Sequence, residues 1–230
     1  MRIIFVRHGE PDYIHDCLTE QGRIQALEAA ERLKDEGIEE IFSSPQGRAA
    51  ETAAAAAKVL NLPVRTLDYM RELHWGSTNG TPIQANGHPW DLADLLPGEG
   101  WDLTDPAWRE HPYFRNNLVT AEADQVALKT DEWLCTLGYE REGAYYHCVR
   151  QDDRQKTIAL FSHGGSSAAA MGHILNLTFP YACGLFHLEF TGITVIRLDR
   201  RPGSRTLPCL ELANDARHIH GIRYHRLAEM

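Results

Sequence analysis

The segment Arg2-Ile3-Ile4-Phe5-Val6, followed directly by Arg7-His8-Gly9, decides the fold of this chain of 230 residues. The run Ile3–Val6, apolar at every position, predicts a strand buried on both faces, as in a parallel sheet. The run stops at Arg7, so Arg7 and His8 are predicted at the carboxyl end of a central strand. Gly9 then lets the backbone approach a ligand closely.

The chain on either side of its middle third alternates between strand and helix patterns. One helix is predicted where Ala26, Ala30 and Leu33 form an apolar stripe, and another at Ser44-Pro45, with proline at the first helical position. Such alternation predicts an α/β fold, a three-layer α/β/α sandwich with a mostly parallel central sheet. The other predicted strands are 38–43, 64–67, 157–162 and a terminal hairpin of 193–198 and 207–212, and the predicted helices cover about 19–35, 44–60 and 166–175.

The stretch from about 74 to 155 breaks this alternation. It carries few strand signals, many aromatic residues and scattered prolines, and its clearest helix pattern covers 121–137. We therefore predict a single domain over 1–230 with an insertion of helices and loops at about 74–155, placed over the active site.

Composition excludes several classes of function. The formal net charge of −9 disfavours nucleic acid or an anionic membrane as the partner. No run reaches the roughly 18 apolar residues of a membrane helix, and no signal peptide is visible at the start. The five cysteines form no C-x-x-C pair, which favours a reducing compartment. We expect a cytoplasmic protein that acts on a small molecule, and the aromatic insertion or an exposed edge strand allows a homodimer.

A second strand ends like the first, because Ser162-His163-Gly164-Gly165 follows the apolar run 157–161. Ligands of open α/β sheets bind beyond the carboxyl ends of the strands, so we expect His8 and His163 to meet there. Gly164 and Gly165 precede a predicted helix and leave free N–H groups at the strand end, which suits an oxyanion. Arg48 lies in the first turn of the helix after the second strand and can reach the same place.

Two imidazoles and two guanidiniums around one point suit a transferring phosphoryl group. Arg7 and Arg48 match its equatorial oxygens with charge-assisted bonds, and a neutral imidazole can attack phosphorus. The leaving alkoxide then needs a proton, for which Glu72, after the third strand, is the best candidate. Arginine and histidine supply the positive charge, so we expect neither a metal nor a cofactor.

Five ordered motifs resemble the histidine phosphatase superfamily, which includes phosphoglycerate mutases and many broad phosphatases. The motifs are Arg7-His8-Gly9-Glu10, Leu18–Ala26, Ser43–Ala53, Arg71–Gly76 and Ser162–Gly165, and a late Asn214–Ile219 resembles the family's C-terminal end. The resemblance implies that His8 is the phosphorylated nucleophile. It also implies that Arg7, Arg48 and His163 bind the phosphate, and that Glu72 protonates the leaving group and later helps water attack the phosphohistidine.

The chain departs from the family pattern at two places. The family often has an asparagine a few residues after the nucleophile, where this chain has Tyr13, Ile14 and His15, so the outer wall of the phosphate pocket is undefined. The family often has a glutamate where this chain has Asn79.

Simpler interpretations compete with these roles. In these, the two histidines are structural residues at strand ends, and Arg48 is a solvated helix residue. Glu72 is then a surface carboxylate or a partner of Arg71. The motifs around them favour the functional interpretation. The spacing of His218, His220 and His225 resembles a metal site but lacks cysteines or carboxylates at fixed offsets, so we expect ordinary packing or solvation there.

Three functions stay open at this point. The first is a phosphatase that hydrolyses a small-molecule phosphomonoester. The second is a phosphoglycerate mutase-type phosphomutase, which would need basic residues to bind a bisphosphorylated intermediate. It is disfavoured because the only arginines and lysines between His74 and Glu132 are Arg109, Arg115 and Lys129. The third is a non-catalytic phospho-ligand-binding protein, which would be expected to have lost one of the five site residues.

Overall fold

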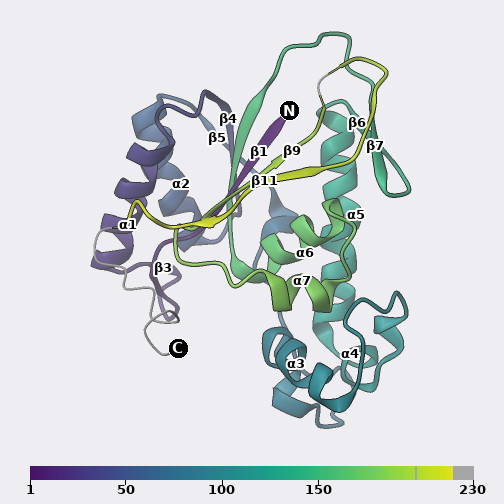
Figure 1. The fold of residues 1–230 in the computed structure, drawn as a ribbon. Coiled ribbons are helices and arrows are strands. Elements are labelled where there is room, and N and C mark those ends of the chain that lie inside the picture. The colour runs from purple at the N-terminus through teal and green to yellow at the C-terminus, as the bar shows by residue number, and fades with distance from the viewer. Residues whose placement is uncertain (200, 220–230) are drawn as a thin grey trace.

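A six-stranded sheet forms the centre of the molecule in the computed structural model, which describes residues 1–199 and 201–219 (Figure 1). Its strand order is β11-β9-β1-β8-β4-β5, and β1, β8, β4 and β5 run parallel. The two strands of the predicted terminal hairpin extend the sheet on one side of β1: β9 pairs antiparallel with β1, and β11 pairs antiparallel with β9. The strands are β1 (Arg2–Arg7), β4 (Ile38–Ser43), β5 (Val64–Thr66), β8 (Thr157–Ser162), β9 (Ile193–Arg197) and β11 (Cys209–Asp215).

The side chains of β1 alternate between two cores, which explains its continuous apolar run. Ile4 and Val6 pack in the core under α1 (Glu20–Leu33) and α2 (Gly47–Leu60). Ile3 and Phe5 pack in the core under α5 (Leu118–Thr136) and α6 (Gly164–Ile174). Helices therefore cover both faces of the sheet, and the predicted three-layer α/β/α sandwich is confirmed.

The register of the parallel strands brings three strand ends to one edge of the sheet. Arg7 lies opposite Ser162, and Ser43 opposite Phe161. The next residues continue this alignment, because the His8 N–H donates to Ser162 O and the Ser44 N–H to Phe161 O. The residues that follow β1, β8 and β4 are consequently neighbours in space.

α2 begins at Gly47, two residues after Pro45, which was predicted to be its first helical residue. Ser44 continues the sheet through its bond to Phe161, and its Oγ accepts from the N–H of Gln46, the N-cap of α2. Pro45 therefore lies in the turn before the helix rather than at its first position. The turn leaves the Ser44 side chain at the strand ends.

Residues 74–155 contain more strand than the sequence indicated. β6 (Tyr139–Glu142) and β7 (Tyr145–Cys148) form a hairpin, and β10 (Arg205–Thr206) pairs with β7. The short strands alternate buried Tyr139 and Tyr146 with charged or exposed residues, so they show no apolar run. The helices here are α3 (Pro89–Leu95), α4 (Pro112–Arg115), α5 and the short 3-10 turns Gln84–Gly87, Leu96–Glu99 and Trp108–Glu110.

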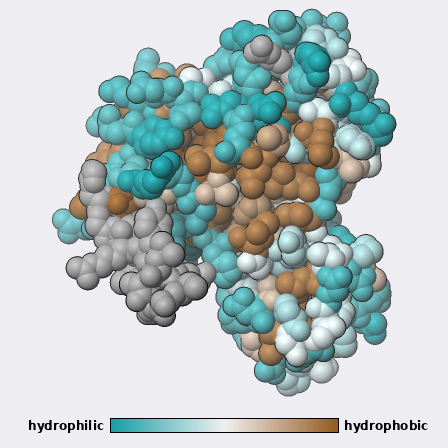
Figure 2. Space-filling model, in the orientation of Figure 1, coloured by the Kyte–Doolittle hydropathy of each residue, from teal (hydrophilic) through white to brown (hydrophobic). Residues whose placement is uncertain are grey.

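The remaining elements connect these layers. The small ladder of β2 (Pro11–Asp12) and β3 (Cys17–Leu18) follows the first strand, a 3-10 turn covers Asp68–Met70, and α7 (Phe179–Leu185) packs on α3 and α6. Apolar residues gather at the centre of the face in Figure 2, in the region where Figure 1 places β11, α6 and α7. Among the described helices, none is both long and apolar enough to cross a membrane.

Candidate active site

His8 is buried at the end of β1 and presents one ring nitrogen to the strand ends. Its Nδ1 lies 2.7 Å from Gly9 O, and its Nε2 accepts from Arg48 Nε at 3.4 Å. A carbonyl oxygen accepts and a guanidinium donates, so the hydrogen must be on Nδ1 and the lone pair on Nε2. Nε2 is therefore the atom that can attack an electrophile.

The surroundings of His8 keep it uncharged. Burial lowers the pKa of His8 to about 3, aided by the charges of Arg7 and Arg48 and opposed by its bond to Gly9. An imidazole with this pKa is neutral at physiological pH, which is the form a nucleophile requires.

Arg7 uses one guanidinium nitrogen in a hydrogen bond within the described residues and leaves its Nε without a partner there. Its Nη1 donates to Leu188 O at 2.5 Å, and its guanidinium lies 4.4 Å above the ring centroid of Phe190. Arg7 Nε is buried and has no hydrogen-bond partner among the described residues. A buried guanidinium N–H of this kind is suited to an anionic oxygen.

Arg48 is held by a residue that the sequence analysis missed. Its Nη1 lies 2.5 Å from Asp16 Oδ1, while Asp16 Oδ2 accepts from the Gly47 N–H at 2.8 Å. Asp16 adopts a left-handed backbone with φ of 49°, which turns the loop after β2 toward α2. Tyr13, whose ring centroid is 5.5 Å from the Arg48 guanidinium carbon, stands at the predicted position of the undefined wall.

His163 faces His8 across the strand ends. The two ring centroids are 5.2 Å apart, and His163 Nε2 lies 2.8 Å from Ser44 Oγ. Burial, with the nearby Arg48, His8 and Arg7, lowers the pKa of His163 to about 2. The predicted meeting of the two histidines is confirmed, and Ser44, which the sequence did not single out, orients the second one.

Glu72 lies across from the histidines at the start of α6. Its Oε1 accepts from the N–H groups of Leu73, Gly165 and Ser166 at 3.0, 2.9 and 3.2 Å. Burial raises the pKa of Glu72, against these hydrogen bonds and the charges of Arg7 and Arg48. All three bonds use Oε1, so Oε2 is the oxygen that we expect to carry an exchangeable proton.

A cavity of about 470 Å³ lies beside this cluster, although His8, Arg48 and His163 are not among its lining residues. Arg7, Glu72 and Gly164 line one part of it, and residues 187–189 form one side. The insertion supplies the opposite wall, as expected of a segment over the site. Its contributions are Trp75, His88, Trp90, Asp91 and Asp94, and Tyr13 completes the lining.

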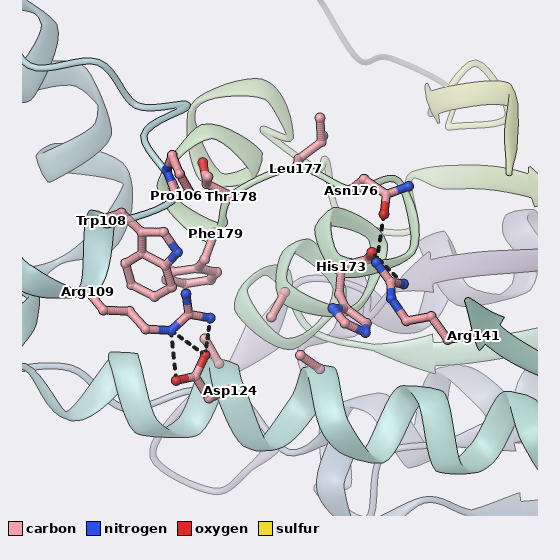
Figure 3. Close-up of a pocket in the computed structure, with 13 residues that line it drawn as sticks. Pro106, Trp108, Arg109, Asp124, Arg141, His173, Asn176, Leu177, Thr178 and Phe179 are labelled. Atoms are coloured by element: carbon pink, nitrogen blue, oxygen red, sulfur yellow. Dashed lines mark hydrogen bonds and ion pairs between the residues drawn. The ribbon is translucent and has the colours of Figure 1, made fainter. Parts of the chain in front are cut away.

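A second cavity, of about 290 Å³, lies beside α5 and the end of α6 and also contains arginines (Figure 3). Its cationic groups already have partners. Arg109 pairs with Asp124, Arg141 donates to Asn176 and Tyr146, and His173 contacts Asp131. Within the described part of the chain, neither Arg109 nor Arg141 has a buried guanidinium nitrogen without a partner, as Arg7 has in its Nε, so the candidate site remains the cluster around His8.

Histidines and carboxylates elsewhere form no obvious metal site. Within residues 1–199 and 201–219, no group of three or more His, Cys, Asp or Glu side chains is placed to hold a metal ion. His218 contacts Thr191 Oγ1 at 3.0 Å, while His220 and His225 lie outside the described residues.

Comparisons with known proteins agree with this geometry. A family model described as the histidine phosphatase superfamily (branch 1) matches residues 3–113. A protein named "Probable phosphoglycerate mutase GpmB" from Yersinia pestis (strain Pestoides F) is 33% identical over 228 residues, which cover 95% of each chain. A relative of the same name from Proteus mirabilis is 25% identical over 228 residues, again 95% of each chain.

Two solved structures share the fold. A mycobacterial glucosyl-3-phosphoglycerate phosphatase, solved with inorganic phosphate, superposes with a TM-score of 0.63 at 24% identity, over 95% of this chain and 99% of that chain. A phosphoserine phosphatase from Entamoeba histolytica gives 0.61 at 23% identity, over 95% of this chain and 98% of that chain. With a family model over its first half and a 33% identical relative along its length, the chain belongs to the histidine phosphatase superfamily.

Proposed function

We propose that this protein is a phosphatase that hydrolyses a small-molecule phosphomonoester through a phosphohistidine on His8, without a metal. The observation that carries the proposal is the lone pair of His8 Nε2, which points at Arg48 in a pocket shared with Arg7 and His163. A neutral nucleophile beside two guanidiniums is the arrangement that in-line phosphoryl transfer requires.

The first step transfers the phosphoryl group to the enzyme. His8 Nε2 forms a bond to phosphorus as the bond from phosphorus to the ester oxygen breaks. Arg7 and Arg48 stabilise the charge on the equatorial oxygens. The leaving alkoxide takes a proton from Glu72, whose pKa is raised by burial.

The second step returns the enzyme to its starting state. Glu72, now a carboxylate, accepts a proton from a water molecule as that water attacks the phosphohistidine. The bond from phosphorus to Nε2 breaks, and inorganic phosphate leaves. His163 lies beside His8 with its Nδ1 buried and without a hydrogen-bond partner among the described residues, so this nitrogen is available to a phosphate oxygen.

A phosphomutase is the second candidate, because the curated relatives carry mutase names. A mutase must hold a second anionic group while the phosphoryl group changes position. The three basic residues that the sequence offered for this are engaged elsewhere: Arg109 pairs with Asp124, Arg115 with Glu110, and Lys129 with Glu132. None of them lines the cavity at Arg7 and Glu72, which favours hydrolysis.

A non-catalytic phospho-ligand-binding protein is the third candidate. It would be expected to lack a nucleophile, an arginine or an acid. His8, Arg48 and Glu72 are all present, Arg48 contacts His8, and the charge of Arg48 acts on Glu72, which favours catalysis.

Phosphate release from p-nitrophenyl phosphate and a panel of alkyl phosphomonoesters tests the proposal. We expect turnover that survives a metal chelator, and an acid-labile phosphoenzyme trapped from labelled substrate. The His8→Ala variant should lose both, whereas His147→Ala, a change in β7, should keep both. A folded enzyme that releases no phosphate from any ester, or His8→Ala with activity intact, would refute the proposal.

The acceptor of the phosphoryl group separates phosphatase from mutase. Labelled phosphoenzyme is mixed with excess 3-phosphoglycerate, and the label is followed into inorganic phosphate or into the acceptor. Label recovered mainly in a bisphosphorylated product would replace hydrolysis with mutase chemistry. The cytoplasmic location and the homodimer stay predictions, to be tested by cell fractionation and by sedimentation.

A further inference from the structure

The part of the cavity beyond the phosphate pocket has its own chemical character. A methyl group built on Gly164 would lie 3.9 Å from Arg7 Nε and 3.6 Å from the Trp90 ring. The aromatic wall therefore begins directly beside the group that would hold the phosphate. The alcohol portion of a bound ester must lie along this wall.

The wall is a row of three rings from the insertion. The Trp75 and His88 ring centroids are 4.9 Å apart, and those of His88 and Trp90 are 5.5 Å apart. Trp90 is fixed because its Nε1 donates to Phe186 O at 3.2 Å. Trp75 is 37% exposed and Tyr13, elsewhere in the lining, is 66% exposed, so both keep ring surface open to a ligand.

The charges around this wall are negative. Asp91 and Asp94 of α3 and Glu189 of the opposite side all line the cavity. His88 Nδ1 lies 3.0 Å from Asp91 Oδ2. Among the described lining residues, Arg7 is the only arginine or lysine, and the phosphate would take up its charge.

We propose that the alcohol portion of the substrate carries a cationic ammonium group, so that the substrate is a phosphomonoester of an amino alcohol. This inference rests on the proposed phosphatase function. Aromatic faces attract ammonium groups through the ring quadrupole, and neighbouring carboxylates add to that attraction. Esters with neutral hydroxyl groups bind less well, and esters with a second anionic group are repelled.

A series of three similar-sized esters tests this ranking. Phosphoethanolamine ends in an ammonium group, glycerol 3-phosphate in a hydroxyl group, and 3-phosphoglycerate in a carboxylate. We expect kcat/KM to fall in that order, with about tenfold or more between the first and the last. The p-nitrophenyl ester, which has no second charge, reports turnover independently of the ranking.

The acidic side chains are tested by the ratio of two rates. In the double variant Asp94→Asn with Glu189→Gln, the ratio of kcat/KM for phosphoethanolamine to that for 3-phosphoglycerate should fall by about tenfold. Asp102→Asn removes a carboxylate of the same insertion that lies outside the cavity lining, and it should keep the ratio. A ratio is insensitive to a partly folded sample, because both rates then fall together.

The outcomes separate the two proposals. Turnover with equal rates for the three esters, a preference for 3-phosphoglycerate, or an unchanged ratio in the double variant would overturn the ammonium inference and leave the phosphatase intact. No turnover on any of the four esters would overturn the phosphatase function and this inference with it.

Discussion

Asp16 Oδ1 lies 2.5 Å from Arg48 Nη1, and the same carboxylate accepts the N–H of Gly47 at the start of α2. One side chain therefore fixes both the arginine and the helix that carries it. The Arg48 side chain is 7% exposed and that of Asp16 is 44% exposed, so the pair connects the pocket to the surface.

Replacing Asp16 by alanine should weaken catalysis without removing a group that contacts substrate. Arg48 would lose its orientation, and misplacement of about 1 Å can cost up to about a hundredfold in rate. We expect kcat/KM to fall about tenfold to a hundredfold on p-nitrophenyl phosphate. Asp12→Ala, at the end of β2 and bonded to Ile14 and His15, is the control and should stay near the parent. Equal losses in both variants would argue against the orienting role of Asp16.

Glu72→Gln should separate substrates by their leaving groups. Alkyl esters need a proton on the departing oxygen, whereas p-nitrophenolate leaves without one. We expect kcat to fall by about 10²-fold to 10⁴-fold for alkyl esters and far less for the p-nitrophenyl ester. The raised pKa of Glu72 sets the pH dependence, because the acid form is lost as pH rises through that pKa. The alkaline decline should therefore be steep for alkyl esters and shallow for the p-nitrophenyl ester, and equal profiles would remove Glu72 from the donor role.

The buried histidines should make the fold sensitive to acid. The pKa is lowered from 6.5 to about 3 for His8 and to about 2 for His163 in the folded chain. As pH falls below 6.5 the unfolded chain takes up protons that the folded chain does not, so the free energy of unfolding decreases. His163→Gln should reduce this slope by about 1.4 kcal/mol per pH unit between pH 6 and pH 3. Ser44→Ala, which keeps the imidazole, is the control for urea unfolding at several pH values, and an unchanged slope in His163→Gln would contradict the assignment.

Gly22→Ala should disturb the backbone beneath His8. A methyl group at this position would lie 2.1 Å from Glu10 O, and one at Gly9 would lie 2.5 Å from Gly22 O. The first turn of α1 and the loop after His8 thus approach each other so closely that neither Gly22 nor Gly9 has room for a side chain. We expect a loss of about 1–3 kcal/mol in the free energy of unfolding. Gly98→Ala meets nothing within 4 Å and should change stability by less than about 0.5 kcal/mol. Equal changes in the free energy of unfolding for Gly22→Ala and Gly98→Ala would show that the backbone at Gly22 can relax away from the added methyl group.

The sequence predicted those parts of the site that short chain segments define. The apolar run before Arg7 required burial on both faces, and that burial placed His8 at a central strand end. The same reasoning placed His163, because its strand is also fully buried. Asp16 escaped prediction because its role depends on a left-handed turn and on a contact with a helix 31 residues away.

The insertion escaped prediction for a different reason. Tyr139 and Tyr146 are buried in the β6–β7 hairpin, but the polar residues between them hide the strands in a scan for apolar runs. Trp90 and Asp94 face the cavity only because α3 packs on α7, a contact between segments about 90 residues apart. No local pattern records such a contact.

Residues 186–190 connect the two ends of the cavity. Phe186 O accepts from Trp90, Leu188 O accepts from Arg7, and the Phe190 ring lies under the Arg7 guanidinium. For protein engineering, the insertion and residues 186–190 should be treated as one unit, to be exchanged together. A graft of a foreign insertion alone would remove the bond from Trp90 that holds this segment at Phe186, so a transplant should carry both pieces.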